Sequence, residues 1–162
     1  MNYVNLSWND IEGYCNDLAI KIKATKFQPD MIIALGRGGM IPARLMSDIL
    51  GVQNVCMFGI KLYTGVSTKK DKPTIEPFNH IIEKKNVLLI DDILDSGITI
   101  EKAYETLYNK KPKSIKIATL LCKKTSLKKP TFFSKECLEN EWIIFPWEIC
   151  EFPQVNYLVI QQ

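Results

Sequence analysis

Residues 87–99, which read VLLIDDILDSGIT, decide how this chain folds. The first four are valine, leucine and isoleucine only, a composition typical of a short strand that is buried on both faces of a sheet. A buried strand should not continue into charge, so we expect Asp91 and Asp92 to lie where this strand leaves the core, at its carboxyl edge. Open α/β sheets bind their ligands at that edge.

The second half of the stretch predicts an anion-binding turn. It reads Asp-Ser-Gly-Ile-Thr at residues 95–99 and precedes residues 100–108, whose apolar side chains have helical spacing. A helix N-terminus offers unpaired backbone N–H groups and a positive dipole end, and the hydroxyls of Ser96 and Thr99 add donors. Two carboxylates just upstream suit a sugar phosphate, since ribose hydroxyls donate to carboxylates while the amides bind phosphate. The alternative is a solvated turn that only caps a helix.

A second unit of strand, glycine turn and helix precedes this one. Residues 31–35 read MIIAL, which is a further buried strand, and Pro42 lies near the first turn of the helix that follows. The turn between them contains Gly36, Arg37, Gly38 and Gly39. Glycines permit positive φ and close backbone approach, and the planar guanidinium of Arg37 can bind a doubly charged group such as pyrophosphate. The alternative is a tight turn in which glycine serves the geometry only.

Three more elements and one long polar segment are predicted along the chain. Ser7 is a suitable N-cap for an amphipathic helix that ends before Pro29. Residues 55–63 form a third strand, and residues 114–122 alternate and then become apolar, as expected of a fourth core strand. Residues 64–79 are polar and aperiodic, which favours either a functional loop or a solvated linker.

The composition limits the class of protein. With 162 residues, of which 46% are hydrophobic, the chain can bury one core and is too short for two ordinary domains. No apolar run approaches the roughly 18 residues of a membrane span, and the first residues lack the order of a secretion signal, so we expect a cytoplasmic protein without membrane contact. The formal net charge of +3, with lysines in short clusters, favours small anionic substrates over nucleic acid.

The cysteines predict neither a catalytic nor a metal site. Their number is five, which is odd, and their spacing is unpaired, so we expect free thiols that mostly serve packing. A nucleophilic cysteine would need a histidine partner, but the chain has a single histidine, His80, in a polar stretch. The sequence therefore disfavours a Cys/His enzyme and a zinc site.

Residues 87–99 resemble the phosphoribosyl-diphosphate motif of the type I phosphoribosyltransferases. The resemblance implies a mainly parallel, twisted α/β sheet that is flanked by helices, with a small C-terminal hood. It implies a single domain over 1–162. The core of this domain would lie at about 30–125, and the hood at about 126–162, with or without the N-terminus.

The same resemblance assigns the contacts to the sugar and its 5-phosphate. Asp91 and Asp92 would face the ribose hydroxyls and take part in binding Mg²⁺. The residues that would bind the 5-phosphate are Asp95, Ser96, Gly97, Ile98 and Thr99. Lys61 and Tyr63 would contact diphosphate at the base of a mobile loop, whose closure excludes water from the reaction.

Two further motifs resemble parts of the purine enzymes in this family. Residues 34–43 are similar to the pyrophosphate loop of the 6-oxopurine phosphoribosyltransferases, where a strained and often cis peptide would fall at Gly36-Arg37. Residues 142–148 resemble the tail of the bacterial xanthine-guanine phosphoribosyltransferases. This implies that Trp142 stacks on the purine, that the backbone at Ile143 contacts the purine edge, and that Glu148 is associated with a second magnesium ion.

The resemblance implies an enzyme of purine salvage. It would transfer phosphoribose from 5-phosphoribosyl diphosphate to N9 of a 6-oxopurine, with Arg37 and Mg²⁺ stabilising the leaving pyrophosphate. Asp95 would be the acid/base partner at purine N7, and Lys123 would bind the 6-oxo group. Two alternatives stay open, namely an enzyme of another base specificity and a regulator that binds the activated sugar without catalysis. The family also suggests a homo-oligomer, either a dimer or a tetramer.

Overall fold

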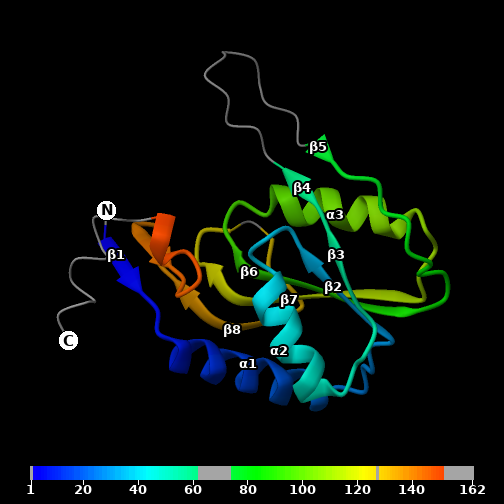
Figure 1. Cartoon of the computed structure of the whole chain (residues 1–162), viewed down its shortest axis with the longest axis horizontal. Helices are drawn as coiled ribbons and strands as arrows, with labels where there is room; N and C mark the ends of the chain where they lie inside the picture. The colour runs from blue at the N-terminus through cyan, green and yellow to red at the C-terminus, as the bar shows by residue number, and fades with distance from the viewer. Residues whose placement is uncertain (1, 62–73, 127, 152–162) are drawn as a thin grey trace.

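The computed structural model describes residues 2–61, 74–126 and 128–151 (Figure 1). Its main element is a sheet of five strands in the order β3-β2-β6-β7-β8, in which every neighbouring pair is parallel. The strands are β2 (Met31–Leu35), β3 (Val55–Phe58), β6 (Asn86–Leu94), β7 (Ser114–Lys123) and β8 (Phe132–Cys137). The carboxyl ends of all five strands therefore lie at one edge, and the predicted fold class is confirmed.

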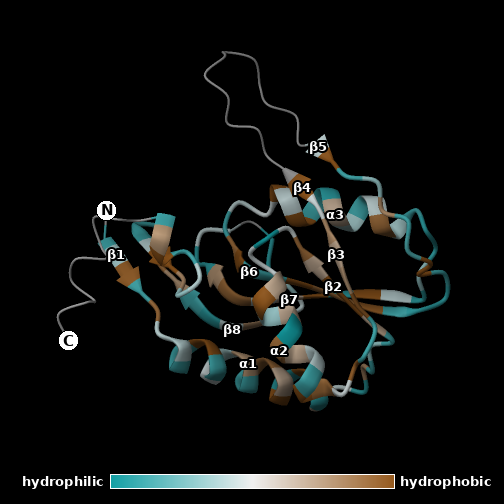
Figure 2. Ribbon diagram, in the orientation of Figure 1, coloured by the Kyte–Doolittle hydropathy of each residue, from teal (hydrophilic) through white to brown (hydrophobic). Residues whose placement is uncertain are grey.

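Helices cover both faces of this sheet. Helices α1 (Trp8–Lys23) and α2 (Met40–Leu50) lie on one face, and α3 (Ile98–Tyr108) lies on the other (Figure 1). Side chains of a strand alternate between the faces, so Leu88 packs in the cluster under α1 and α2, while Leu89 packs in the cluster under α3. The inner strand β2 is accordingly hydrophobic throughout, while the helices carry both hydrophobic and hydrophilic residues (Figure 2).

The boundaries of the helices follow from local chemistry. Helix α1 begins with a capping box, in which the Ser7 hydroxyl accepts from the Asp10 backbone N–H at 3.2 Å and the Asp10 carboxylate accepts from the Ser7 N–H at 2.8 Å. The Ser7 hydroxyl and the Ser7 backbone N–H both donate to the Asp10 carboxylate and hold the pKa of Asp10 below its ordinary value. Helix α2 ends at Gly51, whose φ of +69° is the left-handed conformation that glycine supplies at helix C-termini. Both predicted helices are confirmed.

The predicted third strand is interrupted. Residues 55–58 form β3 in the main sheet, whereas β4 (Ile60–Lys61) pairs in antiparallel fashion with β5 (Thr74–Ile75). Gly59 lies between the two, where its carbonyl accepts from the Glu76 N–H at 2.9 Å and a Cβ would lie 2.1 Å from a carboxylate oxygen of Glu76. Of the segment predicted to be a loop, residues 74–75 are thus a strand and residues 76–79 have no regular structure, while residues 64–73 lie outside the described residues, as does Tyr63.

A small second sheet stands beside the main one. Strand β1 (Asn2–Asn5) pairs in parallel with β9 (Glu141–Ile144), and a short 3₁₀ helix, η1 (Ile149–Glu151), follows. We call β1, β9 and η1 the hood. Strand β8, which the sequence placed in the C-terminal hood segment, belongs to the main sheet instead, because Phe132 packs in the core cluster on one face and Phe133 against the cluster on the other. Within the described ranges, no helix is both long and apolar enough to cross a bilayer.

Candidate active site

Two aspartates lie at the carboxyl end of the central strand. Strand β6 continues through Asp91 and Asp92 to Leu94, so the expectation that it ends before the charges is wrong. The reason is β7, which extends the parallel ladder as far as the pairing of Leu94 with Cys122. Each carboxylate is also held by the next backbone N–H, which donates from Asp92 to Asp91 at 3.0 Å and from Ile93 to Asp92 at 2.7 Å. The aspartates are therefore fixed in place by regular structure.

Burial perturbs these carboxyl groups strongly. The pKa of Asp91 lies well above its ordinary value, because the group is removed from water and the charge of Asp92 is beside it. Burial also raises the pKa of Asp92 to about 6, with a contribution from the charge of Glu148. The pKa of Glu148 is itself raised, mainly by burial. The pKa is thus raised for three acidic groups that lie close together. Such a site favours the binding of a cation or of hydroxyl donors, which stabilise the ionised carboxylates.

The glycine turn after β2 packs against these aspartates. Gly36 has a φ of +55°, and the bond between Gly36 and Arg37 is trans, as is every peptide bond of the described residues, so the expected cis peptide is absent. A Cβ at Gly38 would lie 2.3 Å from an Asp92 carboxylate oxygen, and a Cβ at Gly39 would lie 2.3 Å from the Ile90 carbonyl oxygen. The glycines thus allow the turn to approach β6 more closely than any other residue could.

Three adjoining cavities open along this edge of the sheet. The turn cavity, of about 160 Å³, is lined by Asp91, Ile93, Leu94, Asp95, Ser96, Gly97, Thr99 and Ile100. The loop cavity, of about 340 Å³, is lined by Leu35, Gly36, Arg37, Gly38, Asp91, Asp92, Thr99, Trp147, Glu148 and Glu151. The hood cavity, of about 460 Å³, is lined by Asp92, Ile93, Asp95, Lys123, Glu139, Glu141, Trp142, Ile143, Phe145, Glu148 and Glu151. The first two share Asp91, and the last two share Asp92.

The turn cavity is built on the N-terminus of α3. Gly97 is the N-cap of this helix, with a φ of +83°, and the helix begins at Ile98, two residues before the predicted start. The first turn therefore includes Thr99, which lines the cavity, whereas Ile98 is 50% exposed and does not line it. The Ser96 hydroxyl accepts from the Ile98 N–H at 3.4 Å. The turn presents backbone N–H groups and two hydroxyls to one small space, as the sequence predicts.

The two predicted cations of the site are held differently. The Arg37 side chain is 87% exposed and contacts the Glu151 carboxylate of η1 at 3.3 Å, so it lies at the mouth of the loop cavity. Lys123, by contrast, is only 7% exposed. Its ammonium donates to the Leu138 carbonyl at 2.8 Å and also to the carbonyls of Glu139 and Glu141. Lys123 therefore ties the turn between β8 and β9 to the carboxyl end of β7.

The structure brings most of the predicted residues together, and it adds others. Trp142 and Ile143 line the hood cavity because β9 pairs with β1. Tyr63 and the side chain of Lys61 lie outside what the structure describes. Sequence reasoning missed the acidic residues Glu139, Glu141 and Glu151. No spacing or motif could have found them, because they lie in a polar turn, a short edge strand and a 3₁₀ helix.

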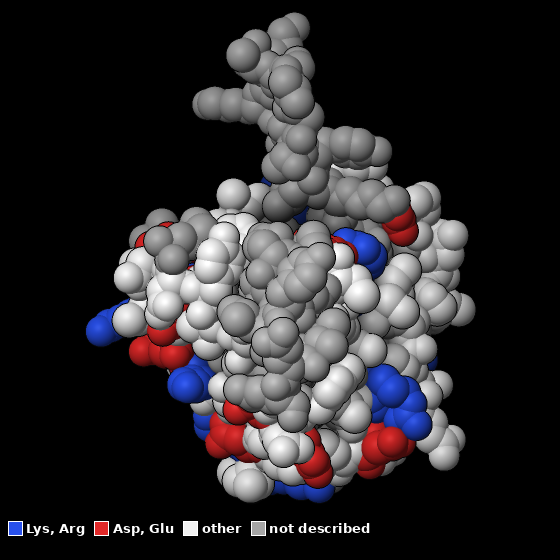
Figure 3. Space-filling model, turned by 60° about the vertical axis from the view of Figure 1, so that its left-hand side comes forward, with Lys and Arg blue, Asp and Glu red and all other residues white. Residues whose placement is uncertain are grey.

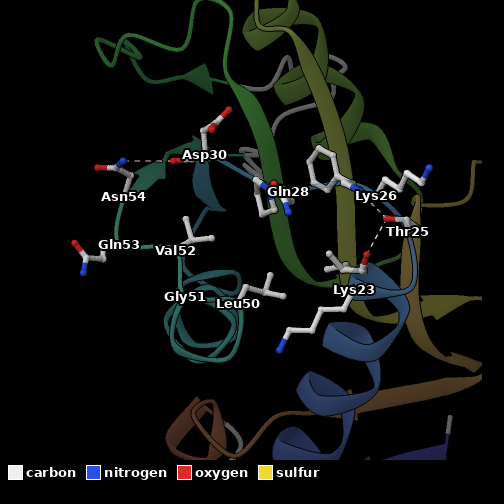
Figure 4. A pocket seen from close by; sticks show the side chains of 13 residues that line it. Lys23, Thr25, Lys26, Gln28, Asp30, Leu50, Gly51, Val52, Gln53 and Asn54 are labelled. Carbon is white, nitrogen blue, oxygen red and sulfur yellow. Dashed lines mark hydrogen bonds between the residues drawn. The ribbon is translucent and has the colours of Figure 1, made fainter.

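A further cavity of about 620 Å³, larger than these three, is not part of this site (Figure 4). It lies at the amino end of the sheet, between the loops that lead into β2 and β3. The Thr25 hydroxyl donates to the Ile22 carbonyl at 2.7 Å, and the Asp30 carboxylate accepts from the Asn86 N–H at 2.7 Å. Because these polar groups are already engaged in hydrogen bonds that stabilise the fold, we assign no function to this cavity.

An open parallel sheet with a glycine turn, an acidic strand end and a helix N-terminus at one edge is an arrangement in which α/β proteins bind their ligands. The comparison with protein families gives the particular class. The chain belongs to the phosphoribosyl transferase domain family, whose model matches residues 6–152, and it is thus a transferase.

Individual relatives agree with this family. The xanthine-guanine phosphoribosyltransferase of Idiomarina loihiensis is 26% identical over 145 residues, which cover 89% of this chain and 86% of the relative. The crystal structure of a purine phosphoribosyltransferase from Pyrococcus horikoshii has a TM-score of 0.81 and 33% identity, covering 91% of this chain and 94% of that one. The Helicobacter pylori xanthine-guanine-hypoxanthine enzyme has a TM-score of 0.82 at 23% identity, covering 96% and 99%, and it shows the fold alone.

Proposed function

We propose that this protein is a purine phosphoribosyltransferase of nucleotide salvage. It transfers phosphoribose from 5-phosphoribosyl diphosphate to N9 of a 6-oxopurine and gives the nucleoside monophosphate and pyrophosphate. The observation that carries the proposal is the junction of the three cavities at Asp91 and Asp92. The two substrates together also have three parts, namely the 5-phosphate, the ribose with its diphosphate, and the purine base. The purine names of the relatives support the choice of base.

The turn cavity suits the 5-phosphate. Helix α3 has eleven residues, so its N-terminus carries a developed dipole, and Gly97 leaves the first N–H groups accessible. The hydroxyls of Ser96 and Thr99 add neutral donors at the same place. This arrangement binds a dianion without requiring a buried cation.

Asp91 and Asp92 suit the ribose hydroxyls and a magnesium ion. Burial raises the pKa of both groups, the charge of Asp92 raises that of Asp91 further, and the charge of Glu148 raises that of Asp92, so either donors or a cation would stabilise their ionised forms. Among the described residues, no three His, Cys, Asp or Glu side chains form a complete metal cage. This fits Mg²⁺, which is commonly bound by one or two carboxylates together with substrate phosphates. When bound, Mg²⁺ neutralises charge on the diphosphate, and Glu148 is placed to assist.

The loop cavity suits the diphosphate. Its backbone turn is compact because of Gly38, and the exposed guanidinium of Arg37 can turn from Glu151 to the leaving group. An exposed ion pair contributes little stability, so the exchange of partners costs little. The family resemblance assigns Lys61 and Tyr63 to the same diphosphate. Charge on the departing oxygen develops in the transition state, which is where Arg37 acts.

The hood cavity suits the purine. Trp142 offers a ring for stacking, the backbone at Ile143 faces the purine edge, and the Lys123 ammonium lies at the wall for the 6-oxo group. Asp95 lines both the turn cavity and the hood cavity, so it is the one residue of the phosphate turn that also reaches the base. That position suits an acid/base partner at purine N7, which adjusts how strongly N9 attacks.

The substitution Asp95→Asn should lower kcat by about 10–10³-fold, the range expected when a positioned acid/base is removed. Asp95 is exposed, so the melting temperature should stay unchanged. Steady-state kinetics with a 6-oxopurine measure the effect, and Asp48→Asn on the outer face of α2 is the matched control. Wild-type turnover in Asp95→Asn would remove Asp95 from the mechanism.

The substitution Lys123→Ala should weaken the use of the base more than that of the activated sugar. Loss of the ammonium frees the carbonyls of the turn at residues 138–141 and removes the donor to the 6-oxo group. We expect KM for the base to rise by about tenfold or more and KM for the sugar diphosphate to change by less than about threefold. The exposed neighbour Lys124 supplies the control variant Lys124→Ala. Equal losses for both substrates would contradict this assignment.

A panel of bases tests the proposed function itself. The purified protein is mixed with 5-phosphoribosyl diphosphate, Mg²⁺ and each of guanine, hypoxanthine, xanthine, adenine, uracil and orotate, and nucleotide and pyrophosphate are measured together. Products with 6-oxopurines alone are expected. Binding of the sugar diphosphate without conversion of any base would instead identify a regulator, and conversion of another base would correct the specificity.

The proposal extends to the cellular location, the assembly and the partners of the protein. All five cysteines are free thiols, which suits the reducing cytoplasm.

The exposed apolar side chains of Val55 and Met57, on the edge strand β3, support a homo-oligomer. On the face seen in Figure 3, Lys and Arg side chains of the described residues are interspersed with Asp and Glu, which agrees with a small anionic substrate rather than nucleic acid.

A further inference from the structure

The residues that line the hood cavity carry mainly negative charge. Six of the residues that line it are acidic, namely Asp92, Asp95, Glu139, Glu141, Glu148 and Glu151. They belong to β6, the phosphate turn, the turn between β8 and β9, β9 itself, the segment after β9, and η1. Among the described residues that line the cavity, Lys123 is the single cation. Arg37, at the mouth of the loop cavity, pairs with Glu151.

The single cation does not neutralise this wall. The Lys123 ammonium donates to three backbone carbonyls, at Leu138, Glu139 and Glu141, so its three protons already have acceptors. One of these contacts must break before the ammonium can donate to a base. The wall therefore presents mainly acceptor groups to whatever enters the cavity.

The two carboxylates nearest to this turn are held in place. A Glu141 carboxylate oxygen accepts from the Leu138 N–H at 2.7 Å, and a Glu139 carboxylate oxygen accepts from the Thr125 hydroxyl. Each of these bonds occupies one lone pair and leaves the others of the carboxylate available. The carboxylates of Glu139 and Glu141, two residues that line the hood cavity together with Trp142, are thus fixed by hydrogen bonds.

The three 6-oxopurines differ in how they meet such carboxylates. Guanine carries an amino group at position 2, which donates hydrogen bonds, and hypoxanthine carries only hydrogen there. Xanthine carries a carbonyl, which accepts, and it loses a proton near neutral pH and becomes an anion. An acceptor or an anion beside a carboxylate is repelled, and the repulsion is larger in a partly desolvated cavity than in water.

We propose that the hood cavity selects guanine and hypoxanthine over xanthine, and that Glu139 and Glu141 are the residues that exclude xanthine. The inference rests on the proposed function and adds the base specificity of the same site. It also distinguishes this chain from relatives whose names include xanthine, such as the Idiomarina loihiensis enzyme.

The first measurement is the ratio of kcat/KM for guanine to kcat/KM for xanthine, at saturating 5-phosphoribosyl diphosphate and Mg²⁺. We expect guanine to be favoured by at least about tenfold at about pH 8.5, and the ratio to be smaller at about pH 6.5, where xanthine is mostly neutral. Titration of groups on the enzyme that affect both bases cancels in the ratio. The ratio therefore reports the charge of the base.

The second measurement uses variants that remove charge and keep shape. In Glu139→Gln/Glu141→Gln, the amide oxygens can still accept from Thr125 and Leu138, so the turn should keep its structure. We expect kcat/KM for xanthine to rise by about 3–10-fold at about pH 8.5, while that for guanine changes by less than about threefold. Turnover of guanine shows that the variant is folded. Glu83→Gln, in the exposed loop before β6, removes one charge far from the cavity and should leave the ratio unchanged.

The outcomes separate this inference from the proposed function. Equal use of guanine and xanthine by the wild-type protein at about pH 8.5 would overturn the selectivity and leave the purine reaction intact. A ratio that does not move in the double variant would remove Glu139 and Glu141 as its cause. No turnover of any 6-oxopurine would overturn both.

Discussion

Replacing the two aspartates of β6 in the double variant Asp91→Asn/Asp92→Asn should make the protein more stable at neutral pH and nearly inactive. Each charged hydrogen bond to a ribose hydroxyl contributes about 1.5–3 kcal/mol, so the loss of two lowers kcat/KM for 5-phosphoribosyl diphosphate by about 10²–10⁴-fold. The two new amide oxygens can still accept from the backbone N–H groups that the carboxylates use in the wild type, so the strand end should keep its shape.

The gain in stability follows from the direction of the pKa shifts. The pKa of both carboxyls is higher in the folded protein than in the unfolded chain, where aspartate titrates near 3.8, and for Asp92 it is about 6. The folded state therefore holds these protons more tightly, and the stability that they contribute is lost as the pH rises through the folded pKa. Amides do not titrate, so above about pH 6.5 the variant should exceed the wild type by about 1–3 kcal/mol in free energy of unfolding.

Thermal or urea unfolding at several pH values measures this difference. The gap between wild type and variant should close as the pH falls to about 3, where both carboxyls are mostly protonated in the folded and the unfolded states. Asp48→Asn is the control, because Asp48 is 70% exposed in an ion pair with Arg44, and its loss should change stability by less than about 0.5 kcal/mol. A double variant that is less stable than the wild type at pH 7 would show that the two charges stabilise the fold.

The substitution Gly39→Ala should destabilise the protein by about 3 kcal/mol or more. The backbone of Gly39 has a φ of −70°, which alanine adopts freely, so only the lack of space excludes a side chain. The added Cβ would lie 2.3 Å from the Ile90 carbonyl oxygen and 2.7 Å from the Leu35 nitrogen. Both are backbone atoms of central strands, and they cannot move without breaking the ladder between β2 and β6.

Gly13→Ala is the matched control for this substitution. Gly13 lies within α1, and nothing lies within 4 Å of the position of its Cβ, so alanine should stabilise the protein by about 0.5–1 kcal/mol. Urea unfolding of the two variants should therefore shift the midpoint in opposite directions. A Gly39→Ala variant as stable as the wild type would show that the turn after β2 can retreat from β6, and the compact loop cavity would lose its structural basis.

The sequence predicts the core of this site well because each motif joins local structure to chemistry. A buried strand followed by acids, and a glycine turn followed by a helix, can each be identified over about ten residues. The error at β6 has a physical origin. Local pattern shows where charge begins, but whether a strand continues through Asp91 and Asp92 depends on the length of its neighbour β7.

The glycine turn after β2 shows a second limit of prediction from sequence. Its composition left open whether the glycines serve geometry or a ligand, and the structure separates the positions. Gly39 faces backbone atoms and is required for packing, whereas Gly38 faces the Asp92 carboxylate, a group of the site. Which atoms surround a glycine depends on the tertiary packing of β2 against β6, and sequence spacing does not contain that information.

The hood was the least predictable part. Strands β1 and β9 have four residues each, and most of their side chains are at least partly exposed, so neither has a strong pattern of its own. The pairing that places Trp142 joins residues 2–5 to residues 141–144. Glu139 and Glu141 acquire a role only through that pairing, and for this reason the base specificity lay beyond sequence reasoning.

The pairing of β1 with β9 also sets an order of events during synthesis. The main sheet is complete once β8 has left the ribosome at Cys137, before β9 has emerged. Strand β1, which is made first, has to wait for a partner almost the whole chain away, and contacts of such long separation form late. A nascent chain would therefore acquire its phosphate and ribose contacts before its purine wall, and the ability to choose among bases would arise last.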